Sequence, residues 1–278
     1  MGLDPRNAFY LRCWGTRGSL PAARPSTNRY GGNTPCVEVR VEGRLFIFDA
    51  GSGIRTLGES LRREKGRIEA DVFFTHYHWD HIHGFPFFAP AYAPQNLFRV
   101  WGERRGRTSV KEILAGQMAM PYFPVPLSAM RARIEVRDVG PGQTLELGPA
   151  TIRTQALNHP GKALSYRIEH AGHAIVYATD TEHGARLDER LVRHAAGADI
   201  LIYDAAYTDH EIRHGRKGWG HSTWREATKV ARAAGVRTLL LFHHEPNRND
   251  DEIGRMERAA RRLFRRTWAA REGRIYRP

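Results

Sequence analysis

Four histidines and an aspartate lie within eight residues of this sequence, directly after a short apolar run. The stretch reads DVFFTHYHWDHIHGF over residues 71–85. The run DVFF has the β-branched and aromatic composition of a buried strand, so the histidines begin where a strand is expected to end. Strand ends are rigid and open onto loops, where chemistry is commonly placed. The chain is therefore expected to fold around a sheet whose strand ends carry a polar site.

The spacing of these residues indicates ligands for two metal ions. Residues two apart in an extended segment point the same way, so His76 and His78 can share one ion. Asp80 and His81 follow after the chain turns, where they can face a second ion beside the first. Nitrogen and oxygen ligands without thiolate favour zinc in an open catalytic site, with manganese or iron as alternatives. We therefore expect two divalent ions per chain, most readily zinc, with manganese as an alternative.

Other short runs rich in β-branched and aromatic residues predict further strands, with helical stretches between some of them. The expected strands cover residues 36–41, 44–51, 71–75, 98–102, 150–157, 164–170, 174–180, 199–205 and 238–244. The expected helices lie near residues 53–64, 109–120, 222–235 and 250–269. Two halves of similar make-up favour two sheets packed face to face with helices outside. The expected fold class is α+β, a four-layer αββα sandwich, as a single domain over residues 1–278.

Several of the expected strands end on a residue that can bind a metal ion. LFIFD ends on Asp49, IVYATD on Asp180, LIYD on Asp204 and LLLFH on His243. Strand ends on such folds are a common location for catalytic groups.

The net charge of +13 arises from 43 Lys and Arg against 30 Asp and Glu. Such a charge favours acidic partners, including nucleic acid, nucleotides and phosphates. Much of the excess lies in RMERAARRLFRRTWAAREGR, residues 255–274, where apolar residues at helical spacing predict an amphipathic helix with a basic outer face. The preferred interpretation of this charge is a solvated helix face, with nucleic-acid contact as the alternative.

Cysteine content and hydropathy bear on the cellular compartment. Only Cys13 and Cys36 are present, too few for a disulfide framework, which favours a reducing environment. No apolar run approaches the roughly 20 residues that a membrane helix needs. We expect a cytoplasmic protein with no membrane partner.

The motif H-x-H-x-D-H after a strand, followed by GFP at residues 84–86, resembles the metallo-β-lactamase fold. The resemblance implies a later histidine, a bridging aspartate and a last histidine, each from a strand end. Order and local context match His159 in ALNHPG, Asp180 in IVYATD and His243 in LLLFHH, rather than the adjacent His244. The implied ligands are His76, His78 and His159 for one ion, and Asp80, His81 and His243 for the other, with Asp180 bridging.

Further motifs resemble the phosphodiesterase branch of that fold, which includes ribonuclease Z and the phosphoribosyl and nucleoside cyclic phosphodiesterases. They include WGTRGSLP, MPYFPVPL and GHST at residues 220–223. The resemblance implies that His221 contacts the scissile phosphate and acts as general acid; the alternative is a surface histidine at a helix start. Asp80 would also orient the nucleophile, a hydroxide bridging the two ions. Asp49 would hold a ligand histidine by its other nitrogen; the alternative is a strand-end turn aspartate with no catalytic part. Asp204 in LIYDAAY is interpreted in the same way.

The segment 85–130 is rich in aromatic residues and proline. Its rings could line the pocket and stack on a base. An equally weighted alternative is that the same rings form core or dimer contacts. The candidate substrate-binding residues are Phe87, Tyr92, Tyr122 and Phe123. Relatives in this branch imply a homodimer.

The expected substrate is a small cyclic phosphodiester, either a cyclic nucleotide or a phosphoribosyl cyclic phosphate. The first alternative is a tRNA 3′-processing endonuclease. By resemblance, that enzyme carries a long arm between its later histidine and the bridging aspartate, whereas His159 and Asp180 are only 21 residues apart. Nucleic acid is therefore an unexpected partner. The second alternative is a thioester or lactam hydrolase on the same fold. A non-catalytic binding module would be expected to have lost ligands, and all seven are present.

Overall fold

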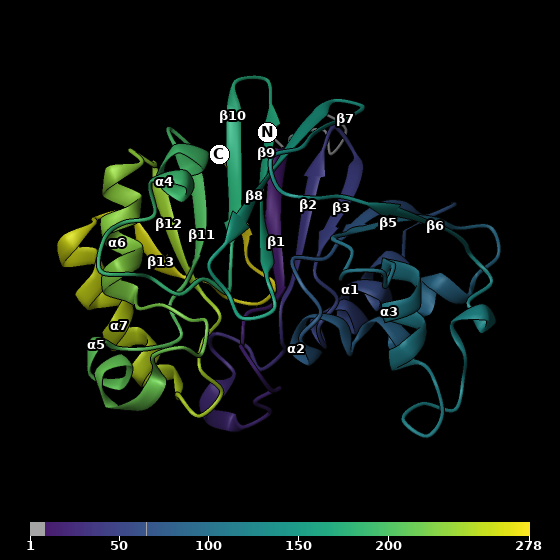
Figure 1. Cartoon of the computed structure of the whole chain (residues 1–278), viewed down its shortest axis with the longest axis horizontal. Coiled ribbons are helices and arrows are strands. Elements are labelled where there is room, and N and C mark those ends of the chain that lie inside the picture. Colours follow the sequence, from purple (N-terminus) through teal and green to yellow (C-terminus); the bar gives the residue numbers. More distant parts are fainter. Residues whose placement is uncertain (1–8, 65) are drawn as a thin grey trace.

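Two seven-stranded sheets pack face to face in the computed structural model, which describes residues 9–64 and 66–278 (Figure 1). The first sheet has the order β14 (Ile275–Tyr276), β1 (Phe9–Gly15), β2 (Cys36–Val41), β3 (Arg44–Phe48), β4 (Glu69–Phe73), β5 (Leu97–Gly102) and β6 (Arg133–Asp138). The second has the order β13 (Thr267–Ala269), β12 (Thr238–Phe242), β11 (Ile200–Asp204), β10 (His173–Ala178), β9 (Ala163–His170), β8 (Ala150–Leu157) and β7 (Thr144–Leu147).

Helices cover the outer face of each sheet, which completes the four layers (Figure 1). The helices of the first half are α1 (Gly53–Leu61), α2 (Trp79–Ile82) and α3 (Val110–Gln117). Those of the second half are α4 (Glu189–Ala195), α5 (Asp209–Glu211), α6 (Trp224–Ala233) and α7 (Asp250–Leu263). Short turns complete the set: η2 (Pro25–Thr27), η3 (Phe85–Phe87), η4 (Ala89–Tyr92), η5 (Leu127–Ala129) and the kinked η6 (Ile212–Arg216). The predicted αββα sandwich is confirmed.

The largest hydrophobic core lies between the two sheets. Phe48 and Phe73 of the first sheet pack on Tyr166 of the second, with ring centroids 5.4 and 5.2 Å apart. All three rings are buried, as expected for aromatic side chains that carry much of a core's apolar surface. Because this core draws on both sheets, we propose that the chain forms one domain; of the expected range 1–278, residues 1–8 and 65 lie outside the described residues.

Strand direction brings the candidate site together. Strands β3 to β6 run parallel to one another, and so do β10 to β13. The central strands β11 and β12 are buried along almost their whole length, which explains their continuous apolar sequences. Carboxyl ends of neighbouring parallel strands meet at one edge. Asp204 is the last residue of β11, and four other candidates follow strands that end at this edge: Asp49, His76, Asp180 and His243.

The helix predicted over residues 250–269 is too long and is corrected here. Helix α7 ends at Leu263, and Thr267–Ala269 form strand β13, paired in parallel with β12. Phe264 leaves the helical conformation at φ −139° and ψ 104°. The helical spacing of apolar residues ends at the helix end, and Thr267–Ala269 join the second sheet as a strand beside β12.

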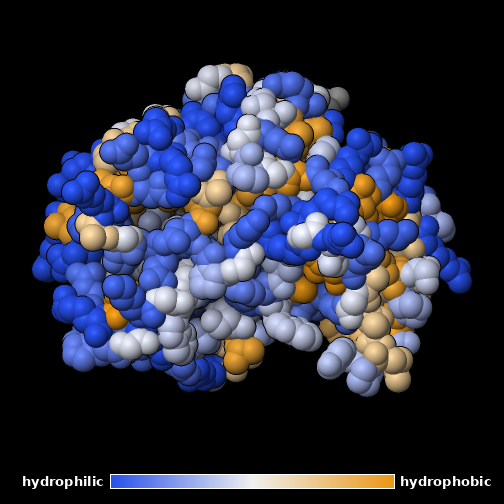
Figure 2. Space-filling model, in the orientation of Figure 1, coloured by the Kyte–Doolittle hydropathy of each residue, from blue (hydrophilic) through white to orange (hydrophobic). Residues whose placement is uncertain are grey.

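Most of the surface in Figure 2 is hydrophilic, and hydrophobic residues form small separate patches. Among the described residues, no helix combines the length and apolar character that crossing a membrane requires.

Candidate metal centre

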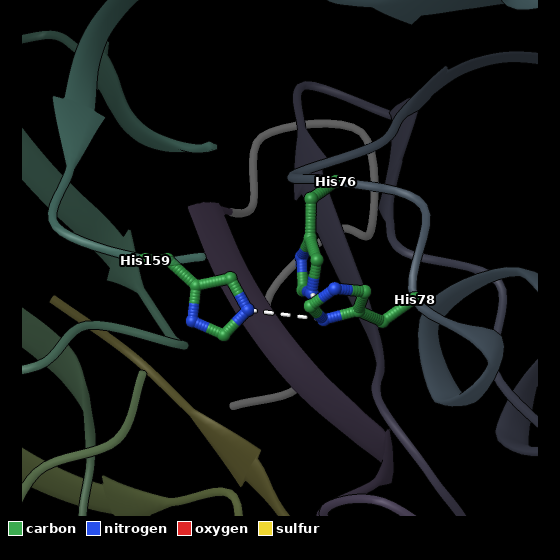
Figure 3. Close-up of side chains that lie close together, drawn as sticks. All are labelled: His76, His78 and His159. Atoms are coloured by element: carbon green, nitrogen blue, oxygen red, sulfur yellow. Dashed lines mark hydrogen bonds between the residues drawn. The ribbon is translucent and has the colours of Figure 1, made fainter. Parts of the chain in front are cut away.

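Three histidines from two sheets converge on one point. His76 and His78 follow β4 of the first sheet, and His159 follows β8 of the second. The Nε2 atoms of His76 and His159 each lie 3.0 Å from Nδ1 of His78. Figure 3 shows the His159 ring directed at the His76 and His78 rings from the opposite side. Three imidazole nitrogens at this separation form a first ligand group.

A second group of four ligand-type side chains adjoins the first. It consists of Asp80, His81, Asp180 and His243, all buried. Nε2 of His243 lies 3.1 Å from Oδ2 of Asp80 and 3.2 Å from Oδ1 of Asp180. Oδ1 of Asp180 also lies 3.8 Å from Nε2 of His76. Asp180 is therefore placed between the two groups, in the position that a bridging ligand would occupy.

The charge balance of the second group favours a cation. Three buried carboxylates, from Asp49, Asp80 and Asp180, surround His81. Burial lowers the pKa of His81, but these carboxylates outweigh burial and raise it well above its usual range. Burial alone would raise the pKa of Asp180, yet His243 and His81 hold it well below its usual range. Three anions around one imidazole favour positive charge at this point, either a proton on His81 or, in its place, a divalent ion bound at Nε2.

The first group has the opposite balance. Burial lowers the pKa of His76, and the neighbouring His81 lowers it further. Burial likewise lowers the pKa of His78 and of His159. These imidazoles are held neutral, which is the form that binds a metal. In the second group, Nε2 of His81 is buried without a hydrogen-bond partner among the described residues, as expected of an atom that faces an ion. The residues present thus fit two divalent ions bound by nitrogen and oxygen.

Asp49 orients one of the candidate ligands. Its Oδ2 accepts hydrogen bonds from Nδ1 of His81 at 2.9 Å and from the hydroxyl of Tyr177 at 2.9 Å. The backbone N–H of Thr75 donates to its other oxygen at 2.8 Å. A carboxylate on Nδ1 leaves Nε2 as the atom that faces the metal group. The sequence placed Asp49 in this supporting position, and the contact is to His81.

Three strand-end residues adopt left-handed backbone. Asp49, Asp180 and His243 have φ values of 61°, 55° and 58°, each just after a buried strand. Asp and His occupy this region more readily than bulky or β-branched residues do. Strain of this kind concentrates at functional sites, because the surrounding fold must hold it.

The segment after β1 closes over the second group, and sequence reasoning missed it. The N–H of Ser19 donates to Oδ2 of Asp80 at 2.8 Å. A Cβ on Gly18 would lie 2.1 Å from the His243 ring, so only glycine fits there. Arg17 is fully buried and donates through Nε to the carbonyl of Gly31 at 2.8 Å, which fixes the segment. The two glycines in GTRGS, residues 15–19, were the sequence signal that this segment approaches another part of the chain closely.

His221 lies beside both groups. Its Nδ1 is 2.8 Å from Oδ2 of Asp204 and 3.8 Å from Oδ1 of Asp180. Its ring stacks on that of His243 with centroids 4.6 Å apart. Burial lowers the pKa of His221, but Asp204 outweighs burial and the pKa is raised to about 9. Asp204, which the sequence suggested as a carboxylate that supports a histidine, contacts His221.

The remaining candidates lie apart from the ligand groups. His244 points to the carbonyl of Ala270, 3.0 Å from its Nε2. Tyr92 and Phe123 pack against the hydrophobic core outside the first sheet, and Phe87 meets Phe123 edge to face at 5.6 Å. Tyr122 is 75% exposed. Tyr92 and Phe123 thus make the core contacts that one alternative expects, and substrate contact by the four rings stays a prediction.

A four-layer αββα sandwich with histidine and aspartate ligands gathered at its strand ends defines a hydrolase of the metallo-β-lactamase fold. The family model described as beta-lactamase superfamily domain matches residues 44–244, and the chain belongs to this family. The resemblance read from H-x-H-x-D-H is confirmed.

Three comparisons with single proteins extend this result. Ribonuclease Z of Thermoplasma acidophilum is 25% identical, covering 98% of this chain and 96% of its own. The metallo-β-lactamase fold protein YhfI from Bacillus subtilis superposes with a TM-score of 0.72 at 20% identity, covering 97% and 99% of the two chains. A diphosphatase of the PhnP family superposes with a TM-score of 0.71 at 19% sequence identity, covering 96% of each chain. The two structural likenesses support the fold.

Proposed function

We propose that the chain is a metal-dependent phosphodiesterase. One observation carries the proposal: a histidine paired with a carboxylate, His221 with Asp204, lies beside two adjoining ligand groups. Asp180 of the second group also lies 3.8 Å from His76 of the first. Two bound divalent ions would polarise a phosphate and lower the pKa of a water molecule. The nitrogen-rich ligand set favours zinc, with manganese as an alternative.

The side chains of this chain would supply the remaining chemistry. Asp204 accepts the hydrogen bond from Nδ1 of His221, so Nε2 is the atom that can give a proton to the leaving oxygen. Asp80, held by the N–H of Ser19, would ligate an ion and orient the nucleophile. Asp49 would fix the His81 ring, and the carbonyl of Gly220 accepts from Nδ1 of His159 at 2.8 Å.

Two substrate classes are supported by different observations. The similarity to ribonuclease Z favours tRNA 3′ processing, the first alternative from the sequence. This similarity does not support the expectation that nucleic acid is not a partner. The hairpin between His159 and Asp180 favours a small cyclic phosphodiester. There β9 and β10 pair from His170 and His173 onward, so the connection is a tight turn at Ala171–Gly172 with no arm.

A substrate panel tests the proposal and separates the two classes. The zinc- and manganese-loaded protein is given 3′,5′- and 2′,3′-cyclic nucleotides, a phosphoribosyl 1,2-cyclic phosphate, a precursor tRNA and a thioester. We expect hydrolysis of phosphodiesters only, and the substrate with the highest kcat/KM identifies the class. Turnover of the thioester alone would contradict a phosphodiesterase.

We also propose that the chain forms a homodimer and acts in the cytoplasm. The exposed apolar side chains of Met120 and Tyr122, 76% and 75% accessible, support a contact with a second copy.

A further inference from the structure

Beside His221, an exposed tryptophan and an arginine stack on each other. Cζ of Arg216 lies 4.2 Å from the centre of the Trp219 ring and 5.6 Å from that of Tyr207. Tyr207 in turn meets the His221 ring edge to face at 5.7 Å. We call Tyr207, Arg216 and Trp219 the rim. An unbroken series of side-chain contacts thus joins the candidate proton donor to a surface aromatic ring.

The backbone around Trp219 is held firmly. Glu182 accepts hydrogen bonds from the N–H groups of Gly218 and Gly220, both at 2.8 Å. Gly220 also contacts His159, because its carbonyl accepts from the ligand histidine. A Cβ on Gly220 would lie 2.3 Å from the His159 ring. Trp219 is therefore fixed, by its two neighbours, at a set position beside the candidate metal centre.

The exposure of Trp219 is not explained by packing. Its side chain is 54% exposed although its backbone is fixed, so an apolar ring is presented to solvent in a defined orientation. A rigid exposed ring next to a catalytic group is the arrangement that stacks on a planar ligand. Its partner Arg216 is the last residue of η6, directly after a kink at which His214 and Gly215 depart from helical backbone.

The guanidinium of Arg216 carries a free positive charge. Within residues 9–64 and 66–278 it makes no ion pair, and it is half-buried between two aromatic rings. The nearby carboxylates are already engaged: Asp209 pairs with Arg225 at 2.8 Å and Glu211 with Arg248 at 2.8 Å. A fixed, unpaired guanidinium suits a phosphate oxygen.

We propose that the rim binds a nucleotide, with the base stacked on Trp219 and a phosphate oxygen on Arg216. The proposal rests on the phosphodiesterase function and names the substrate class that this site would prefer. The sequence suggested that rings of the segment 85–130 stack on a base, whereas this proposal assigns that contact to Trp219 in the second half of the chain.

Paired ligands test this assignment without requiring turnover. Binding of adenosine 5′-monophosphate and of ribose 5-phosphate to the zinc-loaded protein is measured by calorimetry. We expect the base to tighten binding by roughly fivefold to a hundredfold, the range for stacking on an aromatic ring. Trp219→Ala should abolish this preference and Trp219→Phe should keep most of it. Arg216→Ala should weaken both ligands alike.

A matched control comes from a second arginine–tryptophan stack. Arg261 lies 4.3 Å from the Trp268 ring, between α7 and β13, and Arg261→Ala should leave both affinities unchanged. If Trp219→Ala keeps the same preference for the base, the proposal that the rim binds a nucleotide is wrong, even if the protein hydrolyses diesters. If the preference depends on Trp219 but the protein hydrolyses no diester, the rim binds a nucleotide and the proposed phosphodiesterase function is wrong.

The affinity for a third ligand, triadenylate, shows whether the bound base belongs to RNA or to a free nucleotide. Tighter binding of triadenylate than of the mononucleotide, lost in Trp219→Ala, would assign the rim to the end of an RNA. Equal or weaker binding of triadenylate would assign it to a free nucleotide.

Discussion

Replacing Asp180 by alanine is expected to remove phosphodiester hydrolysis and to lower the bound metal content. Oδ1 of Asp180 lies 3.2 Å from Nε2 of His243 and 3.8 Å from Nε2 of His76, so this one carboxylate serves both ligand groups. Losing one preorganised electrostatic partner typically costs about 10²–10³ in rate, and loss of a shared ligand should exceed that. Steady-state kinetics and elemental analysis of the same sample measure both effects.

A surface aspartate provides the control for this change. Asp138 is exposed and pairs with Arg104 at 3.2 Å, so Asp138→Ala removes the same group without touching a ligand. It should leave metal content and kcat/KM unchanged. Full metal content and near-normal turnover in Asp180→Ala would contradict a bridging role.

Replacing His221 by alanine is expected to lower kcat by about 10²–10⁴, the contribution of a positioned general acid. Metal content should not change, because His221 is hydrogen-bonded to Asp204 and is not among the seven proposed ligands. Asp204→Asn should produce a smaller loss, since the amide can still accept from Nδ1 but no longer stabilises the charged ring. Single-turnover kinetics on a diester with a poor leaving group measures the effect on the step that needs the proton.

A similar histidine–aspartate pair serves as the comparison. Nδ1 of His173 lies 3.1 Å from Oδ2 of Asp199, at the end of β10 opposite to Asp180. His173→Ala should behave as the unmodified protein. Equal rates for His221→Ala and the unmodified protein would contradict a general acid at His221 and leave it a structural role.

The structure brings together the seven residues that the sequence proposed as ligands, and all of them lie in segments that follow strand ends. Residues two apart in extended backbone share a side, which makes the pairing of His76 with His78 a local property. Asp180 and His243 follow runs whose apolar composition marks buried parallel strands. Strand β6 was missed because it is an edge strand, partly exposed along its length, and its sequence RIEVRD is mostly charged.

Contacts between distant segments could not be predicted in this way. Ser19 meets Asp80 across 61 residues, and the contact uses a backbone N–H that leaves no trace in composition. Glu182 reaches Gly218 and Gly220 through the same kind of contact. The role of the aromatic segment 85–130 was left open for another reason. Rings such as Phe88, which is fully buried, look the same in sequence whether they pack in a core or line a pocket.

The most direct test of the two-ion account is to restore metal stepwise to chelator-treated protein. Hydrolysis of bis(p-nitrophenyl) phosphate is followed while zinc, or manganese in a second series, is added in measured equivalents. We predict negligible activity without metal and a maximum at two equivalents per chain. Full activity without added metal, or a maximum at one equivalent, would contradict a centre built from two ligand groups that share Asp180.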